Sequence, residues 1–174
     1  MELPLATRRK IIAGLALLPA APALAYSPGR VAGSGNFKYE VNRTDAEWRA
    51  MLNEEEYRVM RDGGTEVPKS SPYWNSNEAG IYTCKGCGLE LYDSFWKVDL
   101  DKGWVFFIHS EENAVLTGID GTVPDDSGIL GKFATFVEVH CRRCGSHLGH
   151  ILNVDSFQVH CINGASLNFT PAQA

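Results

Sequence analysis

The sequence lacks several features that would place it in a specialised class of protein. It has no internal repeat, which excludes solenoid and fibrous architectures, and no basic cluster beyond residues 7–10. Its 16 basic and 21 acidic side chains give a net charge of −5, which argues against nucleic acid as a partner. A hydrophobic content of 44% excludes a disordered chain. We therefore expect one globular domain with an appendage.

Long apolar runs are also missing, and the first 25 residues hold only a short one. The basic residues 7–10 precede it, and Ala23-Leu24-Ala25 ends it. This pattern is typical of a signal peptide, and it falls short of the about 20 apolar residues that a spanning helix needs. Adjacent Arg8 and Arg9 favour twin-arginine export, with a general secretory signal or an uncleaved anchor as alternatives. We expect export, to a bacterial periplasm, with no stable membrane anchor once residues 1–25 are removed.

Helical periods are scarce in the rest of the chain. Residues 26–40 are rich in glycine and predict a flexible leader, which leaves one domain over residues 41–174. A capping box at Thr44 predicts one short helix, and Asn53 predicts a second that stops at Gly63. Short β-like runs then follow, at residues 81–83, 89–92, 105–108, 133–139 and 157–162. We expect a mainly β domain of antiparallel strands with a short N-terminal helical cap.

The sequence lacks an even number of cysteines: there are five, so at least one thiol lies outside any paired framework. Four of them form two Cys-x-x-Cys-Gly turns whose thiolates can converge on a common centre. We predict one structural Zn²⁺ per chain, held by Cys84, Cys87, Cys141 and Cys144. The alternatives are two disulfides, a thioredoxin-like redox pair, or zinc held by Cys141, Cys144, His147 and His150.

The fifth cysteine, Cys161, lies on the predicted strand over residues 157–162. A lone cysteine is more often a small buried hydrophobe than a nucleophile. Strand alternation, however, puts Asn163 on the same face as Cys161, and His147 and His150 follow the second cysteine turn. A thiol with an amide and imidazoles nearby is a candidate nucleophile surrounded by hydrogen-bond donors. The alternative is that the two histidines only satisfy backbone groups.

These residues belong to a series of motifs that resembles the methionine sulfoxide reductases of the B type, which reduce the R epimer of methionine sulfoxide. The resemblance runs from about Asp45 to Pro171, and the order and spacing of its motifs make it specific. The motifs are Gly64-Thr65-Glu66-Val67-Pro68, Gly80–Cys84, Lys97, Asp99, Gly103-Trp104, Glu138–Cys141, His147–His150 and Cys161–Leu167.

The resemblance implies a fold, a site and a reaction. The fold is Mss4-like, tent-like or barrel-like, with two antiparallel sheets, a helical cap and a zinc remote from the catalytic thiol. Cys161 is the implied nucleophile, with the polar donors His147, His150 and Asn163 around the sulfoxide and Trp104 against its methyl group. The implied reaction is thiol-dependent: Cys161 becomes a sulfenic acid and methionine is released. We expect repair of free or protein-bound methionine sulfoxide in the cell envelope, with an external thioredoxin-like thiol as reductant.

The chain departs from the family pattern at several positions. Val159 stands where the family usually has Arg, so the pKa of Cys161 is expected near its free value of about 8.5. Val105-Phe106 replaces Pro-Ser, the segment before Cys161 is shorter, and Lys102 stands where many members have a resolving cysteine. The alternatives are therefore a catalytically impaired zinc-binding scaffold and a redox sensor in which peroxide oxidises Cys161.

Overall fold

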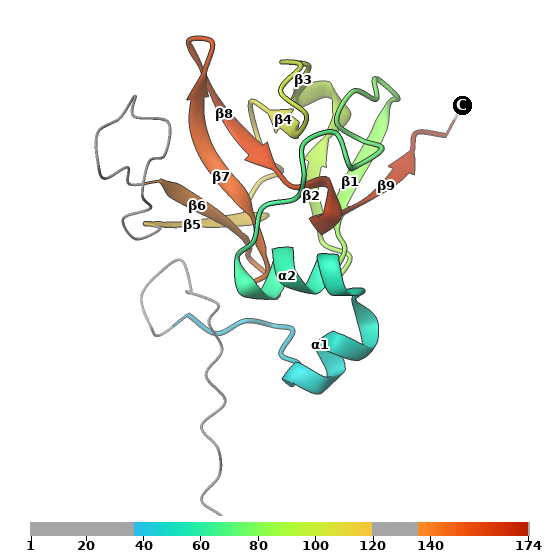
Figure 1. Ribbon diagram of the computed structural model, residues 1–174, viewed down its shortest axis with the longest axis vertical. Coiled ribbons are helices and arrows are strands. Elements are labelled where there is room, and N and C mark those ends of the chain that lie inside the picture. The colour runs from blue at the N-terminus through green and yellow to red at the C-terminus, as the bar shows by residue number, and fades with distance from the viewer. Residues whose placement is uncertain (1–36, 120–135, 174) are drawn as a thin grey trace, which may run out of the picture.

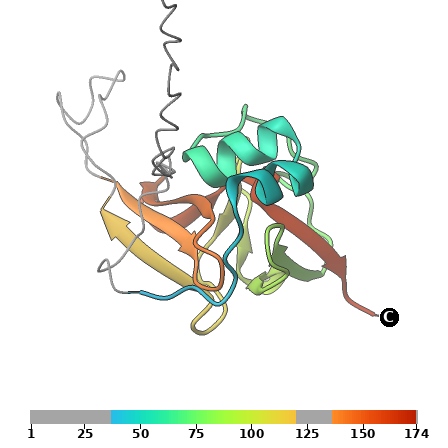
Figure 2. The same cartoon turned by 90° about the horizontal axis from the view of Figure 1, so that it is seen from below.

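The computed structural model describes residues 37–119 and 136–173, and there the chain forms two antiparallel sheets beside a pair of helices. Figures 1 and 2 show both helices on one side of the sheets. The predicted signal peptide, and the predicted leader up to residue 36, lie outside the described residues. The mainly β fold with a helical cap that the sequence predicted is confirmed.

Two short helices, α1 (Asp45–Met51) and α2 (Glu54–Asp62), form the cap. Each opens with a capping box: the N-cap side chain, Thr44 or Asn53, accepts a backbone N–H, and the glutamate three residues later accepts the N-cap N–H in return. Helix α2 ends at Gly63, whose φ of 71° is left-handed and therefore favours glycine. Both helices start where their sequence signals predicted.

The larger sheet has six strands in the order β3-β4-β8-β7-β6-β5, and each pairing is antiparallel. In that order its strands are Lys97–Val98, Val105–Phe107, Phe157–Ile162, His147–Val154, Val137–Cys141 and Val115–Ile119. The run predicted at residues 133–139 lies partly outside the described residues, and most of its described part belongs to β6, which ends at Cys141. The long strand β7 was not predicted.

The smaller sheet has three antiparallel strands in the order β2-β1-β9. In that order they are Glu90–Asp93, Gly80–Cys84 and Leu167–Pro171. The 3₁₀ turn η1 (Ser94–Trp96) leads from β2 into β3, and η2 (Gly164–Ser166) leads from β8 into β9. These two turns carry the chain from one sheet to the other (Figure 1).

The helical cap packs on the first cysteine turn. A Cβ added at Gly86 would lie 3.1 Å from the Trp48 ring and 3.2 Å from Met60, so the two helices press on a turn without a side chain. The backbone oxygen of Gly86 also accepts a hydrogen bond of 3.0 Å from Arg43. Buried aromatic and aliphatic side chains of both sheets, Tyr82, Tyr92, Phe107 and Leu148 among them, complete the core.

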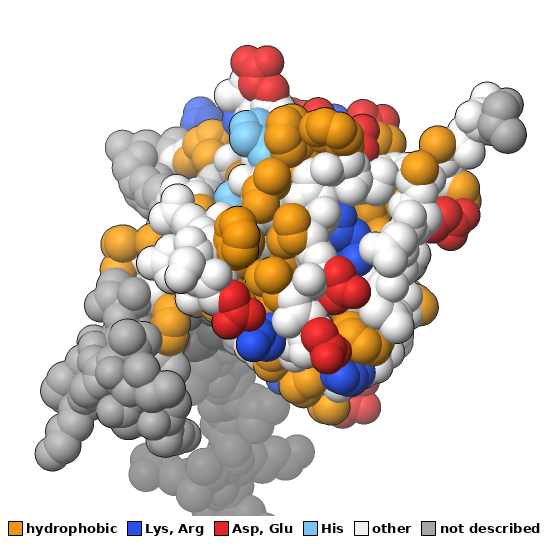
Figure 3. Space-filling model, turned by 90° about the horizontal axis from the view of Figure 1, so that it is seen from above, with side chains coloured by type: hydrophobic (Ala, Val, Ile, Leu, Met, Phe, Trp, Pro, Cys, Tyr) orange, Lys and Arg blue, Asp and Glu red, His pale blue; other side chains and the backbone are white. Residues whose placement is uncertain are grey.

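The surface of the described residues combines apolar and charged areas. On the face shown in Figure 3, hydrophobic side chains gather beside histidine, with acidic and basic side chains bordering them. Within the described ranges, no helix has the length and apolar character needed to cross a membrane.

Candidate functional site

Four side chains form a row across the larger sheet. Strand register places Glu138 of β6 opposite His150 of β7, His150 opposite Cys161 of β8, and Cys161 opposite Phe106 of β4. Residues opposite each other in antiparallel strands project from the same face. The thiol therefore has an imidazole on one side and a buried aromatic ring on the other.

The two middle residues of the row, His150 and Cys161, line a cavity of about 330 Å³. Cys161 lines this cavity together with Trp104, His150 and Asn163, four of the five site residues predicted from the sequence. The remaining wall is formed by Gly63, Thr65, Phe136, Gly149 and Leu152. The volume of the cavity and its mixture of apolar and polar walls suit a small group, such as an amino-acid side chain, better than a large cofactor.

Asn163 and Trp104 are both fixed by hydrogen bonds to the loop that follows α2. The Asn163 side chain is 3% exposed; its Nδ2 donates to the Leu148 carbonyl at 3.0 Å and its Oδ1 accepts from the Glu66 N–H at 2.9 Å. The Trp104 indole Nε1 donates to the backbone oxygen of Glu66 at 3.3 Å. One residue, Glu66, thus connects two walls of the cavity.

His147, the fifth predicted residue, lies behind the cavity and is 3% exposed. Its ring contacts that of His150, with centroids 5.2 Å apart. A register shift in the β6–β7 pairing next to His147 makes this contact possible, because strict alternation would put residues three apart on opposite faces. His147 therefore contacts His150 and does not itself line the cavity.

The carboxylate of Glu138 binds His147. Glu138 Oε1 lies 2.5 Å from His147 Nδ1, and Oε2 lies 2.9 Å from His140 Nε2. Burial opposes ionisation of Glu138, but the bonds from His140 and His147 prevail and lower its pKa to about 2. The ionised carboxylate accepts, so His147 must carry its proton on Nδ1.

The Cys161 thiol lies in an environment that disfavours its ionisation. Burial raises the pKa of Cys161 to about 12, and the negative charge of Glu66 adds to the effect. Val159, on the same face of β8, is fully buried, and no Lys or Arg is among the described residues that line the cavity. The expectation of a pKa near 8.5 was therefore too low, because it allowed for the missing cation but not for burial.

Lys102, at the position where many family members have a resolving cysteine, forms an ion pair. Its Nζ lies 3.2 Å from Asp155 Oδ2, at the tip of the β7–β8 hairpin. The four other cysteines of the chain group together away from Cys161. Among the described residues, no second thiol lines the cavity.

The two cysteine turns meet at one point between the sheets. The sulfur atoms of Cys84, Cys87, Cys141 and Cys144 all lie within 4.8 Å of one another, with contacts of 3.7 Å for Cys84–Cys144 and 3.5 Å for Cys87–Cys141. Four sulfurs at about 2.3 Å from a tetrahedral zinc would be about 3.8 Å apart, so the set fits the ion. Disulfide sulfurs would be about 2.05 Å apart. These residues form a structural zinc site, and neither disulfides nor a ligand set with His147 and His150 fit.

Two carboxylates at the site were missed by sequence reasoning, Glu66 and Glu138. Both occur within motifs of the family resemblance, but neither belongs to a spacing pattern that indicates a role. Their partners, Gly164 and Ala165 for Glu66 and His147 for Glu138, are distant in sequence or on another strand. Only the folded chain brings them together.

The chain is similar to known proteins over most of its length. The family model described as the SelR domain matches residues 52–171. The peptide methionine sulfoxide reductase B2 of Arabidopsis thaliana chloroplasts is 38% identical over 149 residues, which cover 82% of this chain and 68% of that protein. The peptide methionine sulfoxide reductase MsrB of Herminiimonas arsenicoxydans is 42% identical over 134 residues, 75% of this chain and 91% of that protein. Among solved structures, the Mis18 "Yippee-like" domain matches 56% of this chain and its own full length, with TM-score 0.46 and 18% identity.

Proposed function

This chain belongs to the methionine sulfoxide reductase B family, with its SelR domain at residues 52–171, and on that premise we propose that Cys161 reduces the R epimer of methionine sulfoxide. As a member of the family the chain is an oxidoreductase that acts on methionine sulfoxide. The observation that carries the assignment of Cys161 is its place in the wall of a cavity shared with Trp104, His150 and Asn163.

The proposed reaction transfers one oxygen atom. The Cys161 sulfur attacks the sulfoxide sulfur, a bond between the two sulfur atoms forms, and the S–O bond of the substrate breaks as its oxygen takes the thiol proton and leaves as hydroxide. The hydroxide then adds to the Cys161 sulfur, and the bond between the two sulfur atoms breaks with its electron pair on the methionine sulfur. The products are methionine and Cys161 sulfenic acid, so the cysteine sulfur loses the two electrons that the sulfoxide sulfur gains. Two equivalents of an external thiol then reduce the sulfenic acid to the thiol, with one disulfide and one water as products.

The cavity offers a partner to each part of the sulfoxide group. Negative charge develops on its oxygen during the attack, and His150 and Asn163 are placed in the wall as donors. His147, held by Glu138, supports His150 from behind. The indole of Trp104 provides an apolar face for the methyl group, a contact that sulfur and aromatic rings favour.

The surroundings of Cys161 favour this function over a peroxide sensor and over an inactive scaffold. Sensor cysteines have low pKa values and are accessible, whereas burial raises the pKa of Cys161 to about 12. A scaffold without activity has no need for a thiol, an indole, an imidazole and an amide around one cavity.

The biological setting that we propose is repair of oxidised methionine in proteins of the cell envelope. Support comes from the export pattern at residues 1–25, with Arg8 and Arg9. The reductant is a separate matter: apart from Cys161, no described residue that lines the cavity is a cysteine. Because no neighbouring thiol can reduce the sulfenic acid, we propose an external, thioredoxin-like reductant. If Arg8→Lys together with Arg9→Lys leaves the precursor exported as before, twin-arginine export is wrong.

The test of the proposed activity is the stereochemistry of turnover. With a racemic dabsyl-methionine sulfoxide and dithiothreitol, the wild-type chain should consume the R epimer and leave the S epimer. Cys161→Ser should abolish turnover and keep its zinc. Consumption of both epimers at one rate, or an active Ser variant, would contradict the assignment.

A further inference from the structure

We propose that Glu66 is a positioning residue for sulfoxide reduction, because it fixes Asn163 and Trp104 relative to Cys161 from a single buried point. The proposal rests on the function proposed above. Glu66 is 2% exposed, although it lies in the loop between α2 and β1, and its two neighbours in the chain, Thr65 and Val67, are exposed. Burying a carboxylate costs free energy unless hydrogen bonds or a counter-charge compensate for the lost water, so the partners of Glu66 indicate its role.

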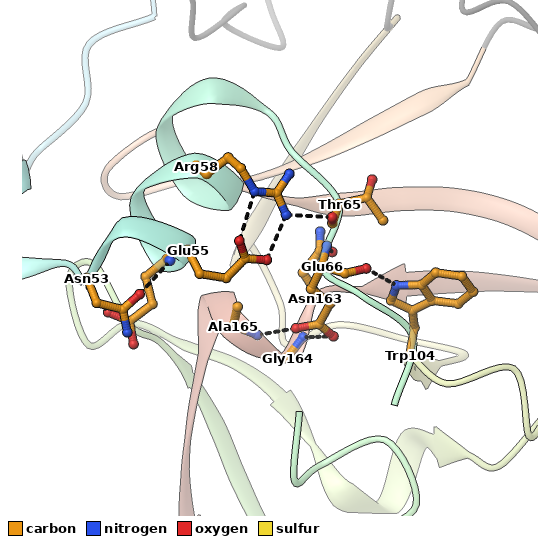
Figure 4. Close-up of polar contacts among 10 residues, drawn as sticks. Asn53, Glu55, Arg58, Thr65, Glu66, Trp104, Asn163, Gly164 and Ala165 are labelled. Atoms are coloured by element: carbon orange, nitrogen blue, oxygen red, sulfur yellow. Dashed lines mark hydrogen bonds and ion pairs between the residues drawn. The ribbon is translucent and has the colours of Figure 1, made fainter. Parts of the chain in front are cut away.

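The carboxylate of Glu66 holds the turn that follows the nucleophile. Its Oε1 accepts the Gly164 N–H at 2.8 Å, and its Oε2 accepts the Ala165 N–H at 2.7 Å (Figure 4). These N–H groups open η2, and the N-cap residue Asn163 does not cap that turn with its own side chain. Glu66 therefore supplies the missing cap from a segment about 100 residues away in sequence.

The backbone of Glu66 holds the two cavity walls. Its N–H donates to Asn163 Oδ1 at 2.9 Å, which fixes the amide of Asn163 with its nitrogen toward the Leu148 carbonyl, in the wall of the cavity. Its carbonyl accepts from the Trp104 indole at 3.3 Å. Figure 4 shows these contacts around Glu66, with Trp104 on one side and Gly164 and Ala165 on the other. The donor for the sulfoxide oxygen and the wall for its methyl are set by one residue.

The loop that carries Glu66 is itself anchored at both ends. At its start Arg58 of α2, paired with Glu55, donates to the Thr65 carbonyl at 2.8 Å. At its end the Lys69 N–H donates to the Gly103 carbonyl at 2.7 Å, directly before Trp104. One anchor is a side-chain hydrogen bond to the backbone and the other joins two backbone groups, so the loop is held on both sides of Glu66.

The negative charge of Glu66 disfavours the Cys161 thiolate, so the benefit of Glu66 must come from the hydrogen bonds by which it positions its neighbours. After burial, the Glu66 carboxylate is the second cause of the raised pKa of Cys161. Burial raises the pKa of Glu66 as well, but the two backbone donors oppose this effect and match the ionised form. Removing the charge alone should therefore help the thiolate to form, while removing the geometry should impair the reaction.

Two variants of the full chain separate these effects. Glu66→Gln removes the charge and places an NH₂ group, which cannot accept, against one of the two N–H donors. Glu66→Asp keeps the charge, but its shorter side chain no longer contacts those donors. Both should lower kcat for the R sulfoxide by about tenfold to 100-fold, because small misplacements at a reacting centre have effects of this size. Iodoacetamide alkylation of Cys161 should shift to lower pH in the Gln variant and stay unchanged in the Asp variant. Glu54→Gln, on the exposed surface of α2, should match the wild type in both measurements.

The outcomes distinguish the proposal from the function on which it rests. A wild type that leaves the R sulfoxide intact contradicts the proposed function, whatever the variants do. An active wild type with Glu66 variants of equal kcat overturns the positioning role. If one Glu66 variant loses zinc or its cooperative thermal transition, kcat of the other, folded variant tests the positioning role. Loss of folding in both would assign Glu66 to fold stability alone and also overturn the proposal.

Discussion

The reactivity of Cys161 depends on the few groups around its sulfur. Its strand neighbours supply an imidazole from His150 and a buried ring from Phe106. The wall of the cavity has polar side chains, but none of its described residues is a Lys or Arg. A thiolate forming there is offered hydrogen bonds without a compensating positive charge, and burial dominates its pKa.

The pH dependence of Cys161 follows from its raised pKa. Because a pKa of about 12 leaves the thiol protonated at neutral pH, alkylation by iodoacetamide should rise about tenfold per pH unit between pH 7 and 10. Val159→Arg places a cation on the same strand face and should move the profile to lower pH. Val159→Met, of similar length without charge, is the control. A profile that levels off below pH 7 in the wild type would contradict this expectation.

Glu138 offers a second test among the charged residues. Its carboxylate accepts from His147 Nδ1, and an amide in its place no longer selects that tautomer because it can donate as well as accept. Glu138→Gln should therefore lower kcat at least about tenfold with zinc retained, and Glu90→Gln on the exposed surface should not. Normal kcat in the Glu138 variant would show that His147 needs no orienting partner.

At the scale of the helices and strands, the sequence predicted best those elements whose ends are marked by characteristic cap residues. The caps at Thr44 and Asn53 and the stop at Gly63 are read directly from the sequence, and both helices follow them. The strand β7 was missed because its first half, from His147 to His150, has a bulge that breaks alternation and was interpreted only as a polar motif. A period of two cannot be recognised where the pairing itself shifts.

The contact between β7 and β8 sets the position of the nucleophile, and Gly149 tests it. A Cβ at Gly149 would lie 2.0 Å from the carbonyl oxygen of Cys161, a distance that backbone atoms cannot accommodate without moving. Gly149→Ala should therefore lower the free energy of unfolding by about 2–4 kcal/mol and kcat by more than tenfold. Denaturant unfolding and steady-state kinetics measure the two effects. Asn153→Ala, exposed on the same strand, should change stability by less than about 0.5 kcal/mol.

At the scale of the whole molecule, the zinc site joins the two sheets. Cys84 ends β1 of the smaller sheet, and Cys141 ends β6 of the larger one. The sequence predicted the four ligands, because two Cys-x-x-Cys turns indicate them without knowledge of the fold. The strand order could not be predicted, since the place of β8 between β4 and β7 depends on pairings between segments far apart in sequence.

Loss of the zinc site should therefore be a loss of the fold. Structural zinc sites in small domains contribute about 10–16 kcal/mol of binding free energy that is available only when the chain is folded. Cys84→Ser should lose zinc, by elemental analysis, and its cooperative thermal transition. Cys161→Ser should keep both. A folded Cys84 variant without metal would show that the core alone holds the sheets together.

The central claim is that Cys161 takes the oxygen of the sulfoxide and that its sulfenic acid forms no disulfide with another cysteine of the chain. A single-turnover reaction without reductant tests it directly. One equivalent of methionine per chain should form from the R sulfoxide, and dimedone should label one sulfenic acid, on the Cys161 peptide. Formation of methionine with an intramolecular disulfide from Cys161 to a zinc-ligand cysteine, or with no label on Cys161, would contradict the account.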